Sequence, residues 1–251
     1  MSFNVLNAWN DISVGNRDNM AADEILEFLP DVVGLQEFDT NYRLAVGTES
    51  LIELISDNYS EIGSEENSWN PLFYNTDTVL PLYYGFETYT DGTEYIMHGT
   101  VMSEFRTYTW AVFEQIESGK QFAVFNTHLD TDPSKRPLQC AEITSKVTEV
   151  MEQYGISNVF LMGDLNSTVS SATAQELFDF GFTDSRSVAI TRDNYGSHGA
   201  LGTEITSIYA AKGIDHIYYI GAGTDVIEYK TITDIRNASD HCPIFVNLKI
   251  K

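Results

Sequence analysis

The segment 107–130 carries the feature that most constrains the fold of this chain. It has two arms, TYTWAVFEQIE and QFAVFNTHLD, in which apolar residues recur at every second position, and the turn Ser118-Gly119-Lys120 joins them. Alternation at period two around a short glycine-containing turn is typical of an antiparallel β-hairpin. The core of the protein is therefore expected to contain a sheet that includes this hairpin.

Short apolar runs typical of strands occupy most of the remaining chain, and only four segments have a helical period. Strands are expected over residues 2–7, 31–37, 71–75, 79–85, 158–163, 214–221, 226–233 and 242–250. Helices are expected over 17–29, 48–59, 137–155 and 172–181, and the polar, glycine-rich segment 184–213 indicates a long loop. Many strands with few helices predict an α/β fold of two packed sheets flanked by helices.

Composition narrows the class of protein. The 251 residues show no linker or repeat, which predicts a single domain over residues 1–251. Hydrophobic residues make up 43% of the chain and aromatic residues 12%, so a disordered or fibrous protein is excluded. The 37 acidic and 14 basic residues give a net charge of −23, which repels polyanions and disfavours long nucleic acid as a partner.

Cysteine content and hydropathy bear on the compartment. Cys140 and Cys242 lack the spacing of a metal cluster, and we expect two buried thiols. No apolar run approaches the ~20 residues of a transmembrane helix, and no basic segment precedes an apolar stretch at the N-terminus. We therefore expect a soluble monomer. Because the sequence starts directly in an expected strand, a cytoplasmic location and a secreted one after removal of an N-terminal segment both stay open.

Polar residues gather where the expected strands begin or end. One such residue alone is more often part of a turn, a cap or a structural histidine. Polar groups at the edges of so many strands are costly unless they are paired or bind a cation, and their number indicates a site. The residues concerned are Asn4, Glu37, Asn126, His128, Asp164, Asn166, Asp215, Asp240 and His241.

The ordered segments SFNV, LQE, NTHLD, GDLNS, IDHIYY and SDHCP resemble the endonuclease/exonuclease/phosphatase superfamily, which includes deoxyribonuclease I, inositol-phosphate 5-phosphatases and sphingomyelinases. The resemblance runs from Asn4 to His241. It implies a four-layer α/β sandwich of two mixed sheets, with the site at one rim. It also implies Mg²⁺-dependent hydrolysis of a phosphoester.

The residue types themselves suit a hard divalent cation. Carboxylate and amide oxygens without thiolates, and without two closely spaced histidines, favour Mg²⁺ or Mn²⁺ over zinc. The resemblance implies that Glu37 is the principal metal ligand, with Asn4 and Asp240 beside it.

The resemblance also assigns catalytic roles. Asp164 is expected to orient or deprotonate the attacking water, and Asn166 to fix the position of Asp164. Asp215 is expected to hold the His241 imidazole, and His128 to donate to a phosphate oxygen. Whether Asp164 or His241 activates the water stays open at this point.

Three further residues are candidates for substrate binding. Arg106 precedes an expected strand, Arg136 opens an expected helix, and His198 lies on the polar loop. Each is predicted to contact a substrate phosphate. An exposed surface arginine is the alternative for Arg106, and the stronger one for Arg136.

Three functions are compatible with these residues. The first is hydrolysis of a small phosphoester, such as a sugar phosphate, a nucleotide or a lipid head group. The second is a metal-dependent nuclease acting on DNA or RNA, which is disfavoured because the longest basic cluster is only Ser134-Lys135-Arg136. The third is a non-catalytic binding module, the weakest of the three because every residue of the core set is present.

Overall fold

The computed structural model describes residues 1–7, 14–38, 49–62, 69–97, 100–199, 213–233 and 238–251. None of the helices in these ranges is both long enough and apolar enough to cross a membrane.

One sheet has seven strands in the order β10-β12-β13-β1-β2-β4-β3. β1 pairs in parallel with β2 and antiparallel with β13, so the sheet is mixed. Its strands are β1 (Ser2–Asn4), β2 (Val32–Gln36), β3 (Tyr59–Ile62), β4 (Leu72–Asn75), β10 (Thr191–Arg192), β12 (Asp225–Thr231) and β13 (Ile244–Lys249).

The second sheet has six strands in the order β5-β6-β7-β8-β11-β9. It contains the predicted hairpin, whose arms pair antiparallel from Tyr108–Thr127 to Glu114–Gln121, and this prediction is confirmed. Its strands are β5 (Val79–Met97), β6 (Thr100–Gln115), β7 (Gln121–His128), β8 (Val159–Asp164), β9 (Thr183–Asp184) and β11 (Asp215–Ile220).

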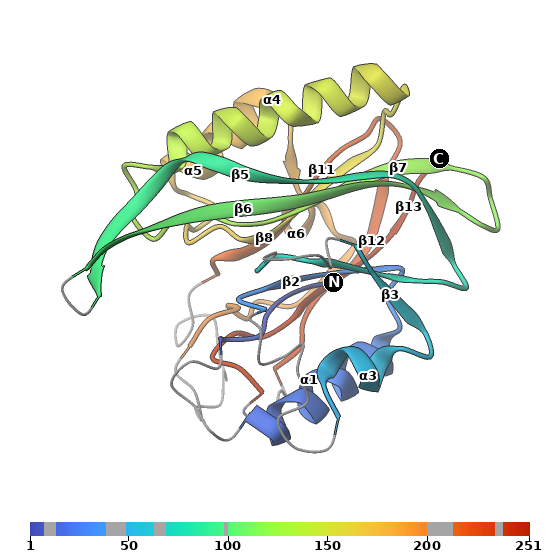
Figure 1. Cartoon of the computed structure of the whole chain (residues 1–251). Helices are drawn as coiled ribbons and strands as arrows, with labels where there is room; N and C mark the ends of the chain where they lie inside the picture. The colour runs from blue at the N-terminus through green and yellow to red at the C-terminus, as the bar shows by residue number, and fades with distance from the viewer. Residues whose placement is uncertain (8–13, 39–48, 63–68, 98–99, 200–212, 234–237) are drawn as a thin grey trace.

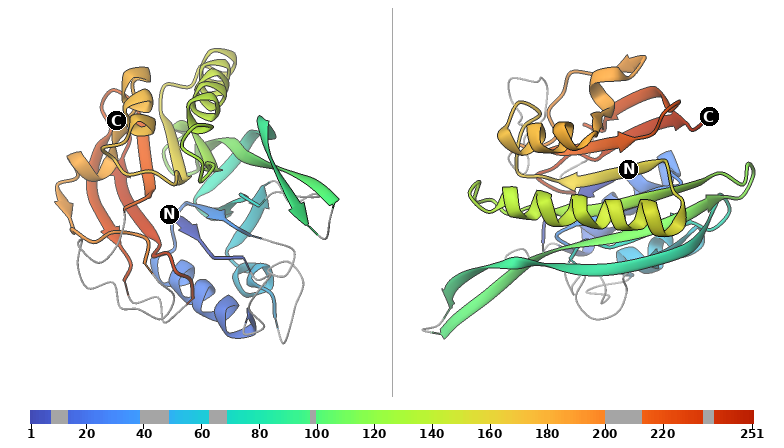
Figure 2. Two further views of the ribbon diagram at one scale, coloured as in Figure 1. Left: turned by 90° about the vertical axis from the view of Figure 1, so that its left-hand side faces the viewer. Right: turned by 90° about the horizontal axis from the view of Figure 1, so that it is seen from above.

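Helices cover the outer faces of the two sheets, which gives four layers (Figure 1). α1 (Val14–Phe28) and α3 (Leu51–Ile55) lie on the seven-stranded sheet. α4 (Arg136–Tyr154) and α5 (Ala172–Phe180) lie on the six-stranded sheet, and the view from above in Figure 2 shows α4 along that sheet. The predicted α/β sandwich of two mixed sheets flanked by helices is confirmed.

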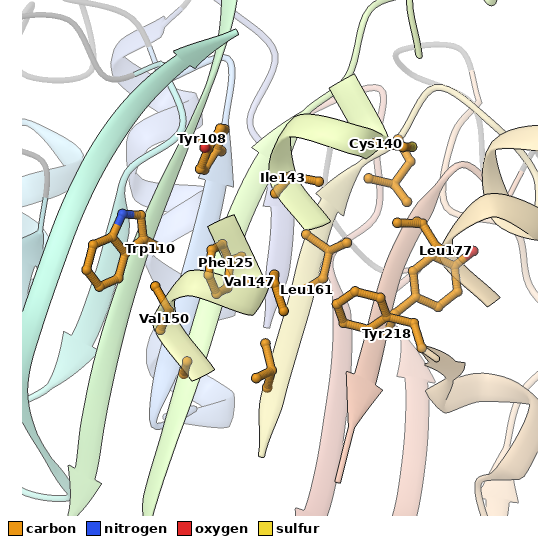
Figure 3. Packing of buried hydrophobic residues seen from close by; sticks show 14 of the residues in the cluster. Tyr108, Trp110, Phe125, Cys140, Ile143, Val147, Val150, Leu161, Leu177 and Tyr218 are labelled. Carbon is orange, nitrogen blue, oxygen red and sulfur yellow. The ribbon is translucent and has the colours of Figure 1, made fainter. Parts of the chain in front are cut away.

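The period-two alternation of the hairpin has a direct structural cause. Trp110 and Phe125 face α4 in the outer core, which Figure 3 shows from close by. Their neighbours Ala111 and Val124 face the opposite way, into the core between the two sheets. Both faces of this sheet are thus covered, and the central strands of the sandwich are held by apolar packing on each side.

Two predictions about segments need correction. The strand expected over 79–85 continues to Met97, and β5 and β6 form a long two-stranded arm that extends past the body of the sheet (Figure 1). The segment 184–213 is not wholly loop, because α6 (Ser185–Val188) and the short strand β10 lie within it. Pairing of β10 with the distant strand β12 supplies backbone partners that the sequence pattern did not reveal. Residues 200–212 of the predicted loop lie outside the described residues.

Buried polar side chains link the two sheets. Asn126 on β7 donates from Nδ2 to the backbone oxygens of Leu35 and Pro71, each at 2.8 Å. Gln36 on β2 donates from Nε2 to Asn126 Oδ1 at 2.7 Å. A Cβ at Gly34 would lie 2.5 Å from Asn126 Oδ1, so the absence of a side chain there leaves room for this link. Asn126, singled out in the sequence, is therefore a structural residue next to the site.

Candidate functional site

The strand register brings three predicted residues into one row. His128 on β7 pairs with Asp164 on the parallel strand β8. Asp164 pairs in turn with Asp215 on the antiparallel strand β11. Because the three occupy the same level of the six-stranded sheet, their side chains lie at one rim, and all three residues are buried.

Asn4 connects this row to the other sheet. It is the last residue of β1 and is fully buried. Its Nδ2 lies 3.1 Å from Glu37 Oε1 and 3.1 Å from Asp164 Oδ2. A single amide therefore bridges the acid that follows β2 and the acid that ends β8.

Two site residues have left-handed backbone conformations. Glu37 has φ 58° and Asn166 has φ 49°. Asparagine adopts this conformation readily, whereas glutamate does so less often and at a cost in strain. Asn166 donates its backbone N–H to Asp164 Oδ1 at 2.8 Å, and its side-chain amide donates to Leu129 O at 2.9 Å. The polar pair Asp164 and Asn166 is thus locked together by a turn immediately after the strand.

Asp164 is the centre of the cluster. Burial, followed by the charge of Asp215, raises the pKa of Asp164 to about 7, although His241, Asn166 and Asn4 act in the opposite direction. A carboxyl group with such a pKa changes its protonation state near neutral pH. This is the range in which a general base is most effective.

His241 forms an ion pair with Asp215. Its Nδ1 lies 2.8 Å from Asp215 Oδ2, and its Nε2 lies 3.7 Å from Asp164 Oδ2. Burial opposes the charged imidazole, but the charge and hydrogen bond of Asp215, with Asp164 and Asp240, outweigh it and raise the pKa of His241 to about 10. The ring is therefore an imidazolium at neutral pH.

His128 has the opposite character. Its Nδ1 lies 3.2 Å from Arg106 Nη1, and its Nε2 lies 2.9 Å from the Asn166 amide and 3.4 Å from Asp164 Oδ2. Arginine and the Asn166 side-chain nitrogen are both donors, so each of the two ring nitrogens faces an N–H group. Burial, with the charges of Arg106 and His241, holds the pKa of His128 well below its usual value, and the ring is neutral at neutral pH.

Asp240 and His198 lie at the open edge of the cluster. His198 Nε2 is 3.8 Å from Asp240 Oδ2, and the two side chains are 30% and 25% exposed. Ser239 connects this edge to β1, because its Oγ donates to Asn4 O at 2.7 Å. Asp240 and Asn4 are thus held close together, although they come from opposite ends of the chain.

Arg136 serves the loop that follows β7. Its Nε donates to Asp130 O at 2.8 Å and its Nη2 donates to Thr131 O at 2.7 Å, and the residue is buried. These bonds fix the start of α4 to that loop. The predicted contact of Arg136 with a substrate phosphate stays a prediction, whereas Arg106 is placed directly beside His128.

Asn7 and Arg17 support the site and were missed in the sequence. Asn7 donates its backbone N–H to Glu37 Oε2 at 3.0 Å. Arg17 on α1 donates to three backbone oxygens, those of Val5, Leu6 and Ala238. In the sequence, Arg17 resembles an ordinary polar position of an amphipathic helix, and only the packing of α1 buries it.

Arg17→Met is expected to destabilise the fold by roughly 3 kcal/mol, because it takes this charged donor from three backbone oxygens, two buried and one partly buried. Chemical denaturation measures the change. Arg192→Met is the matched control, since Arg192 is exposed and also donates only to backbone oxygens. Equal midpoints for the two variants would show that Arg17 does not hold these segments together.

The donors at this rim fit a hard divalent cation. Glu37 and Asp240 supply carboxylate oxygens, and Asn4 supplies an amide between Glu37 and Asp164. Among the described residues, ligand atoms of His, Cys, Asp or Glu come together in threes at Asp164, Asp215 and His241, and at His198, Asp240 and His241. Glu37 is in neither group. Two described hydrogen bonds connect the predicted ligands Glu37, Asn4 and Asp240: the bond from Asn4 to Glu37, and the bond from Ser239, the neighbour of Asp240, to the Asn4 backbone oxygen.

The two packed sheets and the helices that cover them have the arrangement of one class of protein. The chain has the fold of the endonuclease/exonuclease/phosphatase proteins, and the fold implied by the sequence resemblance is confirmed. The sequence itself matches no family model and no curated protein.

Three solved structures illustrate the similarity. An endonuclease/exonuclease/phosphatase from Bacteroides vulgatus has 21% identity and a TM-score of 0.80, over 100% of this chain and 97% of that one. A mannosyl-6-phosphatase from Bacteroides thetaiotaomicron has 19% identity and a TM-score of 0.75, over 99% and 98%. TDP2 from D. rerio, complexed with a single strand DNA product, has 15% identity and a TM-score of 0.69, over 99% and 97%.

Proposed function

We propose that this chain, as one domain over residues 1–251, hydrolyses the phosphoester bond of a small substrate with a bound Mg²⁺ or Mn²⁺. The observation that carries the proposal is the environment of Asp164. This buried carboxylate lies 3.1 Å from Asn4, 3.4 Å from His128 and 3.7 Å from His241. A mannosyl-6-phosphatase and a protein complexed with a DNA product share the fold, which supports phosphoester chemistry.

Glu37, Asn4 and Asp240 are the residues that would hold the metal. When bound, the ion supplies Lewis-acid polarisation of a phosphoryl oxygen and neutralises charge on the leaving group. The Asn4 amide directs its nitrogen to the two carboxylates, and its oxygen, the atom that would serve as a ligand, accepts from Leu6 N at 2.9 Å.

Asp164 is the residue that we assign to water activation. Its pKa of about 7 makes the carboxylate available near neutral pH, and Asn166 fixes one of its oxygens. His241 is already protonated in this range, because its pKa is about 10. An imidazolium cannot accept a further proton, so this arrangement favours Asp164 over His241 as the base.

The remaining polar groups would bind and stabilise the phosphate. His241 carries a positive charge, and the neutral His128 ring lies between Arg106 and the Asn166 amide. Arg106 lies beside His128 and adds a second cation, with His198 at the open edge. Such donors act where negative charge develops in the transition state.

The net charge of the protein favours a small substrate over a long polyanion. The −23 charge opposes the approach of a long polyanion, whereas a small phosphoester responds mainly to the local field of the site. A metal-dependent nuclease is the alternative function, and it is supported by the fold that this chain shares with a protein complexed with a DNA product.

A panel of sugar phosphates, nucleotides, phospholipids, RNA and plasmid DNA, assayed with Mg²⁺ and with chelator, tests the proposal. We expect metal-dependent hydrolysis, with the highest kcat/KM on a small phosphoester. Between low and physiological salt, turnover of that substrate should change little, while any attack on DNA should improve because repulsion is screened.

Three results would contradict this assignment in different ways. Full activity in chelator would exclude the metal. A higher kcat/KM on duplex DNA that falls steeply as salt rises would assign the protein as a nuclease, because that slope reports counterion release. Absence of hydrolysis across the panel would favour the non-catalytic binding module.

A further inference from the structure

His198, Asp240 and His241 form a compact group at the open edge of the site. One ligand atom from each lies within 4.8 Å of the other two. His198 Nε2 and Asp240 Oδ2 are 3.8 Å apart. Two imidazoles and one carboxylate make a donor set that differs from the all-oxygen set around Glu37.

The backbone holds this group in place. His198 and His241 face each other across an antiparallel β-bridge. Hydrogen bonds on both sides fix that bridge, from Gly199 N to Asp240 O at 2.9 Å and from Cys242 N to Ser197 O at 2.6 Å. The two rings have centroids 4.5 Å apart and are tilted by 60°. Opposed residues in such a bridge are direct neighbours, and no rearrangement of the chain is needed to bring them together.

Asp215 orients one of the two histidines. It accepts or shares the proton at His241 Nδ1 at 2.8 Å, so Nε2 is the nitrogen available to a further ligand. A carboxylate behind a metal-binding histidine is the arrangement that fixes the ring and raises its basicity in metalloproteins. This second observation is independent of the distances within the group, and it points to a metal.

We propose that His198, Asp240 and His241 form a transition-metal site that binds Zn²⁺. Imidazole with carboxylate favours Zn²⁺ over Mg²⁺. Tetrahedral zinc places neighbouring ligand atoms about 3.4 Å apart, so the group needs only a small closure from its present spacing. His198 and Asp240 are 30% and 25% exposed, which gives the ion access from solvent and leaves room for a water as fourth ligand. The ion takes the place of the proton on His241.

The binding itself does not depend on the proposed function, but its consequence does. Zn²⁺ at this position removes His241 from the phosphate and occupies Asp240, one of the proposed Mg²⁺ ligands. Zn²⁺ is therefore expected to inhibit a Mg²⁺-activated reaction. The inhibition should be relieved by a chelator selective for zinc while Mg²⁺ is in excess.

Cobalt(II) titration tests the site directly, because Co²⁺ replaces Zn²⁺ and absorbs visible light when it is tetrahedral. The titration is made in the Glu37→Gln protein, in which the proposed Mg²⁺ position is disabled, with excess Mg²⁺ present. We expect one equivalent of Co²⁺ with tetrahedral absorption, displaced by Zn²⁺. His198→Gln should weaken the affinity by roughly tenfold or more, and Asp215→Asn should weaken it in the 10–100-fold range, as loss of an orienting carboxylate does.

Asp225→Asn is the matched control, because it removes the same charge from an exposed aspartate that pairs with Lys251. Its Co²⁺ affinity should equal that of the parent. The proposal is overturned if His198→Gln binds Co²⁺ as tightly as the parent does, or if no tetrahedral absorption appears. Since these readouts need no turnover, they stay informative even if no phosphoester substrate is found.

Discussion

Glu37→Gln is expected to abolish hydrolysis while the protein stays folded. The substitution keeps the shape of the side chain but replaces one carboxylate oxygen, and with it the negative charge that the proposed metal requires. Lewis-acid stabilisation by a metal contributes several kcal/mol, so turnover should fall on the order of 10³-fold or more. Turnover with Mg²⁺ at saturation for the parent measures the effect.

The fold should tolerate this change because Glu37 lies after the end of β2 and keeps an oxygen for Asn7 N or Asn4 Nδ2. The loss of about one hydrogen bond costs roughly 1 kcal/mol. Glu114→Gln is the matched control, since Glu114 lies on β6 and accepts only from Gln121 among the bonds described for it. Wild-type turnover in Glu37→Gln, or equal losses in both variants, would remove Glu37 from the metal site.

Asp164→Asn and His241→Ala are each expected to reduce turnover by roughly 10²–10⁴-fold, the range for loss of an acid or base. For Asp164 the active form is the carboxylate, so activity is present above a pH of about 7 and is lost as the pH falls through this value. For His241 the active form is the imidazolium, which is lost as the pH rises through about 10. The parent should therefore show a bell-shaped profile, with the acidic limb moved to lower pH by a bound cation.

The variants separate the two limbs. Asp164→Asn should lose the acidic limb from its residual activity, and His241→Ala should lose the basic one. The buried Asp164 carboxylate is destabilising to the fold when it is ionised, since its pKa is raised, so Asp164→Asn should be no less stable than the parent at pH 8. If Asp164→Asn kept parental turnover, the base would be another group.

Sequence reasoning named residues that the structure brings together at one rim, because most of them lie where a strand begins or ends. Asp164 and Asn166 could be placed together from spacing alone, because a turn follows the apolar strand that precedes them. The bridge from Asn4 to Asp164 spans 160 positions, and only the packing of the two sheets brings these residues together. Ser239 was missed for the same reason, since its partner Asn4 comes from the opposite end of the chain, and so was the bond from Arg17 to Ala238 O.

The arm formed by β5 and β6 shows the other limit of the pattern. The run 79–85 has the composition of an ordinary strand, but the length of β5 depends on its pairing with β6, which continues beyond the last partner that β7 offers. Likewise, the polar residues 191–192 have no strand-like pattern, and their pairing with β12 alone makes them a strand. Pairing between distant segments cannot be read from local alternation.

The Asn4 amide and the buried Asn126–Gln36 link also determine when during folding a site can exist. The seven-stranded sheet carries Asn4 and is followed by Glu37, but it has none of the row His128, Asp164 and Asp215. The six-stranded sheet carries that row but has neither Asn4 nor Glu37. Either half could be fully hydrogen-bonded within itself and still be inert. A treatment that moves the two sheets apart breaks the Asn4–Asp164 hydrogen bond and separates the two parts of the candidate site while every strand can keep its own hydrogen bonds. Loss of activity is therefore expected to be the earliest sign that the sandwich opens.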